Sequence, residues 1–397
     1  MFESLKSIRR MTLPAFVLTS CLTSLPASAQ DCEVKLGVVG TMSGGGAAWG
    51  LGVKAGAEFQ AALANAEGGI QVGNGKCKVK VYPVDAFCTA AGGAAAGNRL
   101  ASEGVVAIMG PQCSPEVTGW RPVGQRYKQL GFTVTYLSDA LRPEFPLVFH
   151  ALQGPAVVGP ILIKEARKKF KFDSVVVMGP NDQSGTDIGR VYSKMFKDLG
   201  VKSSEEWYQR GTTNFAPIAA RIMAANPDLV EFGATPPADV SGLVRSLLEA
   251  GYKGIFGGMG SIGLQPMLNG AGSVDKVKGY YWIELMPVDD PGARKLRVDF
   301  ERVMKTPPPE NALLYISSTA TEQILRAISK AGTDRDAEKI AAALRSMKPE
   351  SRYFGPGGWR GRAQYGINQE LAFPIGMGVI ADGKNLGVSS VAIPSEK

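Results

Sequence analysis

Residues 34–50, VKLGVVGTMSGGGAAWG, decide the fold class. Apolar and other residues alternate at the start of Val34–Val39, and the segment then becomes continuously apolar, as in a strand buried on both faces. Gly40–Gly46 contains too much glycine to continue this strand. From Trp49 the apolar residues return at helical spacing until Gly68. The stretch therefore predicts a strand, an open loop and a helix. In an open α/β sheet such a loop lies at the carboxyl end of a parallel strand, where ligands bind, and the helix start offers N–H groups to an anion.

The same unit recurs along the chain, and its pattern restarts near residue 150. Further strands are predicted at Val79–Val84, Val105–Met109, Phe132–Leu137, Val148–Leu152, Val175–Met178, Glu206–Tyr208, Leu229–Phe232, Gly254–Phe256, Lys278–Leu285, Phe373–Ile380 and Val388–Ile393. Helices are predicted at Thr89–Glu103, Pro115–Leu130, Gly159–Lys169, from the 179–185 loop to Leu199, and at Phe215–Ala225, Val240–Ala250, Pro291–Met304, Ala312–Lys330 and Ala337–Met347. The alternation predicts parallel sheets with right-handed crossovers. With 397 residues, 45% of them apolar, the chain has enough apolar residues for the hydrophobic cores of two α/β domains.

The first 29 residues have the pattern of a secretory signal peptide. Three basic residues come first, the apolar run Met11–Leu25 follows, and Ala27–Ala29 is a small-residue cleavage site. We therefore predict export, with a mature chain that begins near Gln30. An alternative is lipoprotein processing at Leu18–Cys21, which would leave a lipid on Cys21. No other stretch approaches the roughly 20 apolar residues of a membrane span.

The charge pattern gives no indication of nucleic-acid binding. The formal net charge of +8 is scattered along the chain, apart from the run at Lys164–Lys171, which is typical of a solvated helix end. Aromatic residues do not alternate with this run as they would in a base-stacking surface. We expect solubility and a mild attraction for anionic solutes.

The four cysteines beyond the signal peptide are predicted to form two disulfides. Cys32 and Cys77 each precede a predicted strand, whereas Cys88 and Cys113 each follow one. In a parallel sheet these two groups lie at opposite ends of strands roughly 20 Å long, beyond the roughly 7 Å that a disulfide can bridge. We therefore predict the pairs Cys32–Cys77 and Cys88–Cys113, which export permits. No Cys-x-x-Cys spacing favours zinc.

Sequence patterns of enzymes are absent. The chain has one histidine, His150, and no Gly-x-Ser-x-Gly elbow, Gly-x-Gly-x-x-Gly fingerprint or Gly-Lys-Ser/Thr phosphate loop. We expect no metal, no cofactor and no catalysis, and we interpret His150 as a core or hinge residue.

Small hydroxyl residues recur instead at predicted helix starts. Ser43, Ser114 and Ser184 each follow a strand-end loop. Such a hydroxyl with its neighbouring N–H groups can hold a carboxylate, although simple N-capping explains any one of them. Three in series, shared between two sheets, favour a ligand cleft between lobes. Trp49, just past its glycine loop, is placed to form a wall of that cleft.

At these residues the chain resembles the leucine/isoleucine/valine-binding family of ABC-transporter substrate-binding proteins. The segments that carry the resemblance are residues 34–44, AAWG at 47–50, GVKAGAEFQAALANAEGGI at 52–70, VDAFC at 84–88, GPQCS at 110–114, LRPEF at 141–145 and FGPGGW at 354–359. The resemblance implies a type I periplasmic-binding-protein fold, in which two Rossmann-like α/β lobes are joined by three hinge crossovers. It places residues 30–150 and 283–371 in the first lobe and 151–282 and 372–397 in the second. Hinge residues would be His150, Ile283 and Phe373. The Cys88–Cys113 bridge also matches the family.

Binding residues can be carried over from the same resemblance. It implies that Trp49 faces the side chain of the solute and that Ser114 holds its carboxylate. A loop would supply further backbone contacts through Ser138, Asp139, Ala140 and Leu141.

The second lobe departs from members of the family that bind amino acids. Ser184 precedes Gly185 where those members carry a tyrosine, and Thr235 stands in place of a second tyrosine. The acid that would hold an α-ammonium group is replaced around Met259 and Gly260. A buried ammonium without a counter-charge is costly, so either another acid substitutes or the solute has no amino group. The candidate acids are Asp182, Glu231 and Glu284.

The sequence thus predicts an exported, monomeric binding protein that closes around a small carboxylate-bearing solute. By the resemblance it delivers the solute to an ABC permease in the inner membrane. The solute is expected to be a branched-chain or other amino acid, or alternatively an amino-free acid such as an aromatic carboxylate. A sensor that reports solute to a receptor is a further alternative.

Overall fold

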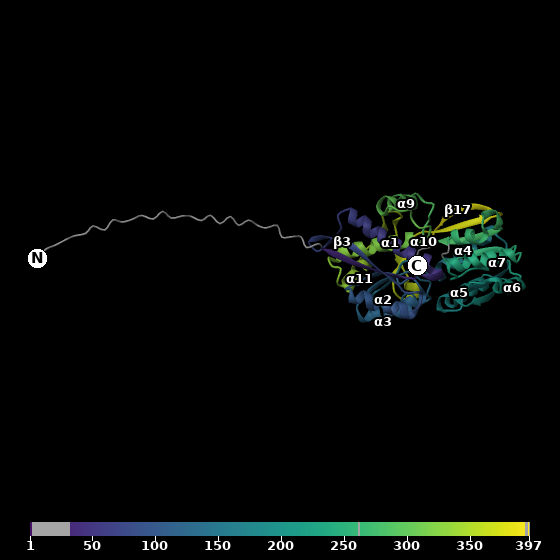
Figure 1. The fold of residues 1–397 in the computed structure, drawn as a ribbon, viewed down its shortest axis with the longest axis horizontal. Coiled ribbons are helices and arrows are strands. Elements are labelled where there is room, and N and C mark those ends of the chain that lie inside the picture. The colour runs from purple at the N-terminus through teal and green to yellow at the C-terminus, as the bar shows by residue number, and fades with distance from the viewer. Residues whose placement is uncertain (2–31, 261–262, 394–395, 397) are drawn as a thin grey trace.

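The computed structural model describes Met1, residues 32–260 and 263–393, and Glu396. Residues 2–29 of the predicted signal peptide, with Cys21 and the cleavage site, lie outside the described residues. Two α/β bodies lie side by side (Figure 1), and we call them the first and second lobe. The first lobe contains an eight-stranded sheet and the second a seven-stranded sheet.

The sheet of the first lobe is parallel at its centre. In spatial order its strands are β14 (Gly358–Arg360), β15 (Glu370–Ala372), β6 (Val148–His150), β5 (Leu130–Thr133), β4 (Ala107–Met109), β1 (Glu33–Gly40), β3 (Gly75–Asp85) and β2 (Ile70–Val72). Only the pairs β14–β15 and β2–β3 are antiparallel. The opening strand pairs with β3 in parallel register, so that Val34 lies opposite Val79 and Val39 opposite Val84. A two-stranded ribbon, β12 (Glu350–Ser351) with β13 (Gly355–Pro356), lies apart from both large sheets.

The sheet of the second lobe is mixed. Its order is β17 (Lys384–Val391), β16 (Ile375–Ala381), β11 (Gly279–Glu284), β10 (Ile255–Gly258), β9 (Leu229–Glu231), β7 (Ser174–Pro180) and β8 (Lys202–Tyr208). From β11 to β8 the neighbouring pairs are parallel, whereas β16 and β17 join in antiparallel fashion. The predicted parallel pairing is therefore confirmed at the centre of each sheet, but it is wrong for β2, β14, β16 and β17 near the edges, which pair in antiparallel fashion.

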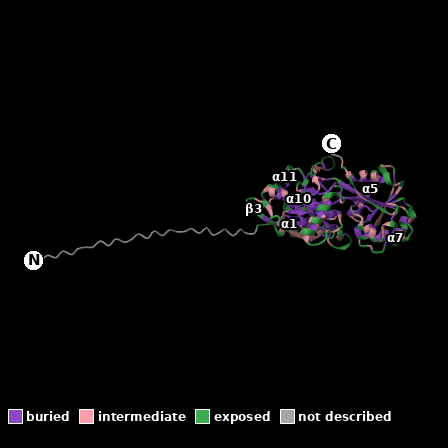
Figure 2. Cartoon of the chain, turned by 90° about the horizontal axis from the view of Figure 1, so that it is seen from above, coloured by how far each residue is buried: buried purple, intermediate pink, exposed green. Residues whose placement is uncertain are grey.

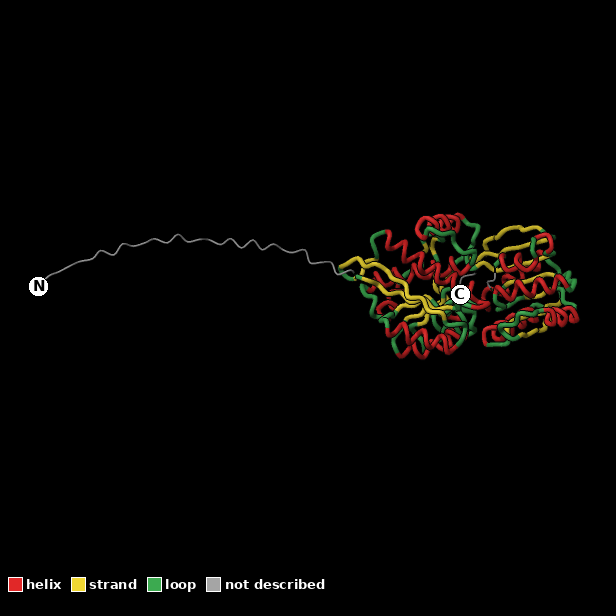
Figure 3. Tube along the Cα trace, viewed as in Figure 1, coloured by secondary structure: helices red, strands yellow, loops and turns green. Residues whose placement is uncertain are grey.

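Helices cover the sheets of both lobes, as the tube view shows (Figure 3). The first lobe has α1 (Ala47–Ala66), α2 (Ala90–Ser102), α3 (Ser114–Arg126), α9 (Pro291–Met304), α10 (Ala312–Ala331), α11 (Ala337–Ser346) and α12 (Arg362–Tyr365), with the 3-10 turn η1 (Gly44–Gly46). The second has α4 (Pro155–Lys169), α5 (Gln183–Asp198), α6 (Ala216–Ala225), α7 (Pro237–Glu249) and α8 (Gln265–Ala271), with η2 (Val274–Lys276). Buried residues gather inside each lobe, around its sheet (Figure 2).

Two predicted boundaries around residue 130 are wrong. The helix expected to reach Leu130 ends at Arg126, because Lys128 takes a left-handed backbone conformation with φ of 51° that turns the chain. The strand expected at Phe132–Leu137 is β5, which starts at Leu130 and ends at Thr133. Residues 134–137 are apolar like a strand, but they form a loop, and Val134 N–H donates to the Pro111 carbonyl at 3.0 Å.

The chain passes between the two sheets three times. It leaves the first sheet after β6, returns after β11, and leaves again between β15 and β16. His150, Ile283 and Phe373 lie at these passages and are buried. The first and third passages are tied together, since the Gln153 amide donates to the Phe373 carbonyl at 2.8 Å. That these residues act as hinges stays a prediction.

Both predicted disulfides are present. Cys32–Cys77 joins the starts of β1 and β3, with Cα atoms 4.5 Å apart. Cys88–Cys113, with Cα atoms 5.2 Å apart, joins the loop after β3 to the start of α3.

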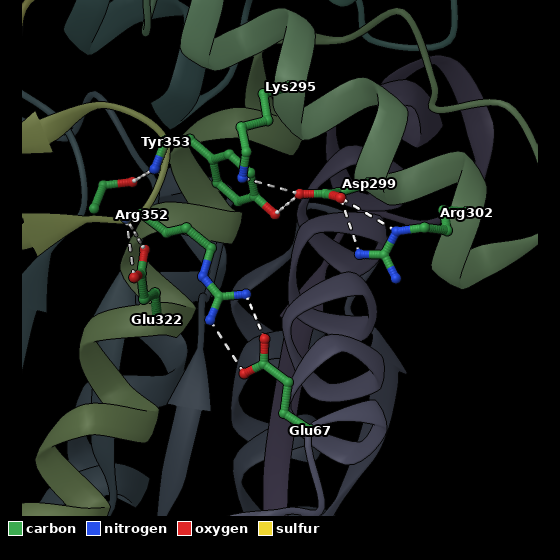
Figure 4. A network of polar contacts seen from close by, with 8 residues as sticks. Glu67, Lys295, Asp299, Arg302, Glu322, Arg352 and Tyr353 are labelled. Atoms are coloured by element: carbon green, nitrogen blue, oxygen red, sulfur yellow. Dashed lines mark hydrogen bonds and ion pairs between the residues drawn. The ribbon is translucent and has the colours of Figure 1, made fainter.

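A polar network ties the segment after α11 to three helices of the first lobe (Figure 4). Arg352 pairs with both carboxylate oxygens of Glu67, at 2.7 and 3.1 Å, and its backbone N–H donates to Glu322 at 3.1 Å. The Tyr353 hydroxyl donates to Asp299 at 3.0 Å. Half-exposed pairs of this kind contribute about 0–1 kcal/mol each, so the main effect of the network is to orient residues 350–353 against α1, α9 and α10.

Candidate functional site

A pocket lies between the lobes, at the carboxyl ends of strands from both sheets. It offers about 450 Å³ of space not filled by atoms, part of it open to solvent. The first lobe lines it with Trp49, Gln112, Cys113, Ser114, Val134, Thr135, Tyr136 and Leu313, the first passage with Leu152, and the second lobe with Ser184, Ile188, Ala234 and Gly260. Open α/β sheets place their ligands at these strand ends.

Tight turns bring the starts of α1 and α5 close to the loops before them. The Gly50 N–H donates to the Thr41 carbonyl at 3.1 Å, and a Cβ at Gly50 would lie 2.1 Å from that oxygen. A Cβ at Gly185 would lie 1.9 Å from the Pro180 carbonyl oxygen. Glycine at each position therefore allows the helix start that carries Trp49 or Ser184 to approach its strand.

Glu116 fixes the loop that leads into α3. Its carboxylate is fully buried and accepts the backbone N–H groups of Gln112 at 3.2 Å and Cys113 at 3.0 Å, and the Thr41 hydroxyl at 2.8 Å. Burial raises the pKa of Glu116, and these hydrogen bonds oppose the rise. The Glu116 side chain of α3 thereby holds the loop before this helix and joins it to the loop after β1.

Two hydroxyls form the polar end of the pocket. The Oγ of Ser114 and the Oγ1 of Thr135 are 3.0 Å apart, and Leu137 N–H donates to the latter at 3.2 Å. Both residues are buried. Because Ser114 is also the first residue of α3, its hydroxyl lies beside the positive end of a helix dipole.

Apolar groups form the other walls. Trp49 and Val134 come from the first lobe, Leu152 from the first passage and Ile188 from the second lobe, while Leu313 reaches the pocket from α10. None of the described lining residues is Asp, Glu, Lys, Arg or His. The site can therefore enclose a small apolar body and hydrogen-bond a polar group at one end.

Glu231, one of the three candidate acids, lies behind the pocket wall. Its Oε1 accepts the N–H groups of Met259 at 2.8 Å and Gly233 at 3.2 Å, and its Oε2 accepts the Tyr281 hydroxyl at 2.8 Å. Burial raises the pKa of Glu231 to about 7. Its hydrogen bonds hold the two turns whose next residues, Ala234 and Gly260, line the pocket.

The other two candidate acids are engaged elsewhere. Asp182 caps α5 through the Gly185 N–H at 3.1 Å and pairs with Arg210. Glu284 accepts the Trp282 indole N–H at 2.8 Å in a different hollow, and burial raises its pKa to about 7.

The structure brings three predicted site residues together and places the rest outside the pocket lining. Trp49, Ser114 and Ser184 share the pocket. Ser43 and Ser138 are exposed. Asp139 pairs with Arg121 at 3.3 Å and with Arg142, while Ala140 and Leu141 pack in the core. The Thr235 hydroxyl donates to the Met178 carbonyl at 3.3 Å, and the Met259 carbonyl accepts the Tyr192 hydroxyl at 2.8 Å.

Several lining residues were not predicted from sequence. Gln112 lies inside the GPQCS segment, and Leu152 is the last residue of the predicted strand Val148–Leu152, so local signals existed for both. Thr135 was not predicted as a lining residue because residues 132–137 resemble one continuous strand, whereas the strand ends at Thr133. Leu313 had no local signal, since only the packing of α10 against α1 brings it to the pocket.

No group of three or more His, Cys, Asp or Glu side chains among the described residues could hold a metal ion. Likewise, none of the helices in the described part of the chain is long and apolar enough to cross a membrane.

Two α/β lobes with a partly apolar, uncharged pocket between them define a solute-binding protein. The chain belongs to the periplasmic binding protein family, whose model matches residues 33–373. This is a family of non-enzymatic solute-binding proteins, in keeping with the absence of enzyme motifs from the sequence.

Three known proteins illustrate the similarity. The leucine-, isoleucine-, valine-, threonine- and alanine-binding protein of Pseudomonas aeruginosa is 25% identical over 319 residues, 79% of this chain and 82% of its own. A branched-chain amino acid transporter substrate-binding protein of Streptococcus pneumoniae, solved with isoleucine, matches with a TM-score of 0.75 at 17% identity, over 90% and 99% of the two chains. An ABC-transporter solute-binding protein of R. palustris, solved with 4-hydroxybenzoate, matches with a TM-score of 0.72 at 21% identity, over 90% and 96%.

Proposed function

We propose that this protein is the exported solute-binding component of an ABC uptake transporter and that it captures a small organic acid without an amino group. The lobes close around the acid and present it to a permease in the inner membrane. Closure follows from ligand contacts that both lobes make only when they are together.

The carboxylate of the solute is assigned to the polar end of the pocket. Ser114 and Thr135 can both turn a hydroxyl hydrogen toward it, and the start of α3 adds the positive end of its dipole. Ser184, at the start of α5, faces the same space from the second lobe. Hydrogen bonds to a charged oxygen are worth about 1.5–3 kcal/mol each.

The absence of an acid from the described pocket lining carries the proposal. An α-ammonium group enclosed here would lose its water without gaining a counter-charge, which is costly. Asp182, Glu231 and Glu284 each have other partners. Residues 261–262, next to Gly260, are Ser and Ile in the sequence and bring no carboxylate. The 4-hydroxybenzoate of the R. palustris structure belongs to the proposed class of solute.

A branched-chain amino acid is the second candidate. It is favoured by what the Pseudomonas aeruginosa and Streptococcus pneumoniae relatives bind, and the apolar walls suit a branched side chain. Its ammonium would have only uncharged acceptors among the described lining residues, such as backbone carbonyl groups and the side-chain oxygens of Gln112 and Ser184.

Matched pairs of solutes that differ only in the amino group separate the two candidates. We would titrate the refolded, ligand-free protein calorimetrically with leucine against 4-methylpentanoate, and with phenylalanine against 3-phenylpropanoate, and add benzoate. The proposal expects the amino-free member of a pair to bind at least about tenfold more tightly. Tighter binding of leucine or phenylalanine would overturn it in favour of the second candidate.

A serine variant locates the site. Ser114→Ala removes one hydroxyl from the polar end and should weaken binding of the acid about tenfold or more, since a hydrogen bond to a charged group is lost. Ser102→Ala, at the exposed end of α2, is the matched control and should bind like the wild type. Equal affinities of the two variants would place the carboxylate elsewhere.

A further inference from the structure

His150, the only histidine in the chain, lies in β6 between the pocket and the first passage. Its side chain is fully buried. The ring nitrogen Nε2 lies 2.6 Å from the carbonyl oxygen of Thr135, and Nδ1 lies 3.0 Å from Oε2 of Glu370. Each ring nitrogen therefore has one oxygen partner.

The partners decide where a ring proton must lie. A carbonyl oxygen can only accept, so Nε2 must carry a proton. Oε2 of Glu370 also accepts the Gly154 N–H at 3.1 Å, and Arg360 Nε lies 3.8 Å from the other oxygen, Oε1. Nδ1 and Oε2 of Glu370 are within hydrogen-bond distance whichever of the two carries the proton. The hydrogen-bond pattern thus requires a proton at Nε2 of His150 and a hydrogen bond between Nδ1 and Glu370.

The other groups around the ring are consistent with this assignment. Tyr365 in α12 meets the imidazole edge to face, with ring centroids 6.5 Å apart, and burial raises the pKa of its hydroxyl. Among described residues, the titratable or charged groups facing the pair are thus Glu370 in β15, Arg360 in β14 and Tyr365 in α12. Removing one partner of this buried contact is costly, because the polar group that remains is left without a hydrogen bond.

The His150 contacts join three functional parts of the molecule. Thr135 lines the pocket, where its hydroxyl lies 3.0 Å from that of Ser114. β6 leads into the first passage, and β15, which carries Glu370, leads into the third. One ring therefore connects the backbone of the pocket loop to two of the three passages between the lobes.

We propose that His150 is a positioning residue for solute binding. By donating to the Thr135 carbonyl it holds the loop of residues 134–136 in place, and by pairing with Glu370 it anchors that loop to the strands that enter the passages. The polar end of the pocket is thereby set before the solute arrives. This inference rests on the proposed function only for the position of the solute beside Thr135.

The first test needs no solute. Tag-free protein labelled with 15N-histidine gives a single imidazole, so nuclear magnetic resonance at pH 7.5 reports both ring nitrogens of His150 without assignment. We expect a proton on Nε2. A bare Nε2 would remove the donor to Thr135 and overturn the proposal. Because no ligand is involved, this result is independent of the identity of the solute.

Two amide variants then separate the two contacts. Asparagine places its amide nitrogen near the position of Nδ1 and glutamine near that of Nε2, so His150→Asn keeps a donor for Glu370 and His150→Gln keeps one for Thr135. The probe is 4-methylpentanoate, or leucine if leucine is what the wild type binds. We expect His150→Asn to weaken binding about tenfold and His150→Gln to stay within about threefold of the wild type. Both substitutions should lower the melting temperature.

The comparison distinguishes positioning from a purely structural role. If affinity falls equally in the two variants, or in proportion to their melting temperatures, the proposal is wrong. Should His150→Asn fail to fold, the wild-type imidazole signals serve instead: addition of the probe should shift the Nε2 signal more than the Nδ1 signal. No shift at Nε2 on saturation with a bound probe would contradict the coupling.

Discussion

At the residue scale, the buried carboxyl of Glu231 shapes the pocket wall contributed by the second lobe. It links the turns at Gly233 and Met259 to Tyr281 of β11 through three hydrogen bonds. Burial raises its pKa from 4.5 to about 7. The folded protein therefore binds this proton more tightly than the unfolded chain does.

The sign of the pH dependence follows from that shift. The contribution of Glu231 to the free energy of unfolding is fully present below about pH 4.5 and is lost as the pH rises to about 7. Glu231→Gln should remove this loss, because the amide oxygen can keep the two N–H donors and the amide nitrogen can donate to Tyr281. At pH 8 we expect the variant to be more stable by about 1–3 kcal/mol, measured by urea unfolding from pH 4 to pH 8. The exposed Glu249→Gln is the control, and a variant profile parallel to that of the wild type would refute the assignment.

At the element scale, the recurring unit is a strand, a short loop and a helix whose start faces the pocket. The unit depends on a close approach between the helix start and the loop, which glycine permits at Gly50 and Gly185. The helix start in turn sets the position of Trp49 or Ser184. Backbone packing at the element level therefore controls side chains in the site.

Gly185→Ala tests this dependence. The added Cβ would lie 1.9 Å from the Pro180 carbonyl oxygen, so the start of α5 must move. We expect a loss of about 1–3 kcal/mol in the free energy of unfolding and at least a tenfold loss of affinity for the bound acid. Gly75→Ala is the control, since nothing lies within 4 Å of its Cβ position. Unchanged affinity in Gly185→Ala would show that the start of α5 does not position the solute.

At the scale of the whole molecule, the lobes are in contact around the pocket. Thr118 of α3 and Gln183 of α5 share a hydrogen bond across the gap, with Nε2 and Oγ1 3.1 Å apart. On the other side, a Cβ at Gly45 would lie 3.1 Å from Asp239 and 3.7 Å from Pro236 at the start of α7. The glycine loop after β1 is thus also one of the places where the lobes touch.

A larger side chain at this place should hold the lobes apart. The Cβ of a residue at position 45 would already lie 3.1 Å from Asp239, so the larger side chain of Gly45→Leu should push the glycine loop away from α7. We therefore expect a larger radius of gyration by small-angle X-ray scattering in the presence of solute. Affinity should fall about tenfold or more, with a melting temperature close to that of the wild type because both cores are untouched. Gly75→Leu, on an exposed hairpin, is the control. If Gly45→Leu closed and bound like the wild type, the contact would have no part in closure.

The sequence by itself determined the features that depend on neighbours along the chain. Apolar runs and glycine loops gave two α/β units, and the positions of cysteines at strand starts and ends selected both disulfides. Serine after a strand-end loop pointed to Ser114 and Ser184, because the carboxyl ends of parallel strands meet at one edge of a sheet. These are local or nearly local consequences of backbone geometry.

Only the tertiary structure decided which distant groups share the pocket and which are kept from it. Thr135 faces Ser114 because β5 ends earlier than its apolar run indicates, and Leu313 arrives because α10 packs against α1. The sequence left Glu231 as a candidate partner for a solute. Its carboxylate instead accepts hydrogen bonds from the backbone N–H groups of Gly233 and Met259. Burial and hydrogen-bond partners are set by the packing of whole elements, and a linear pattern does not contain that information.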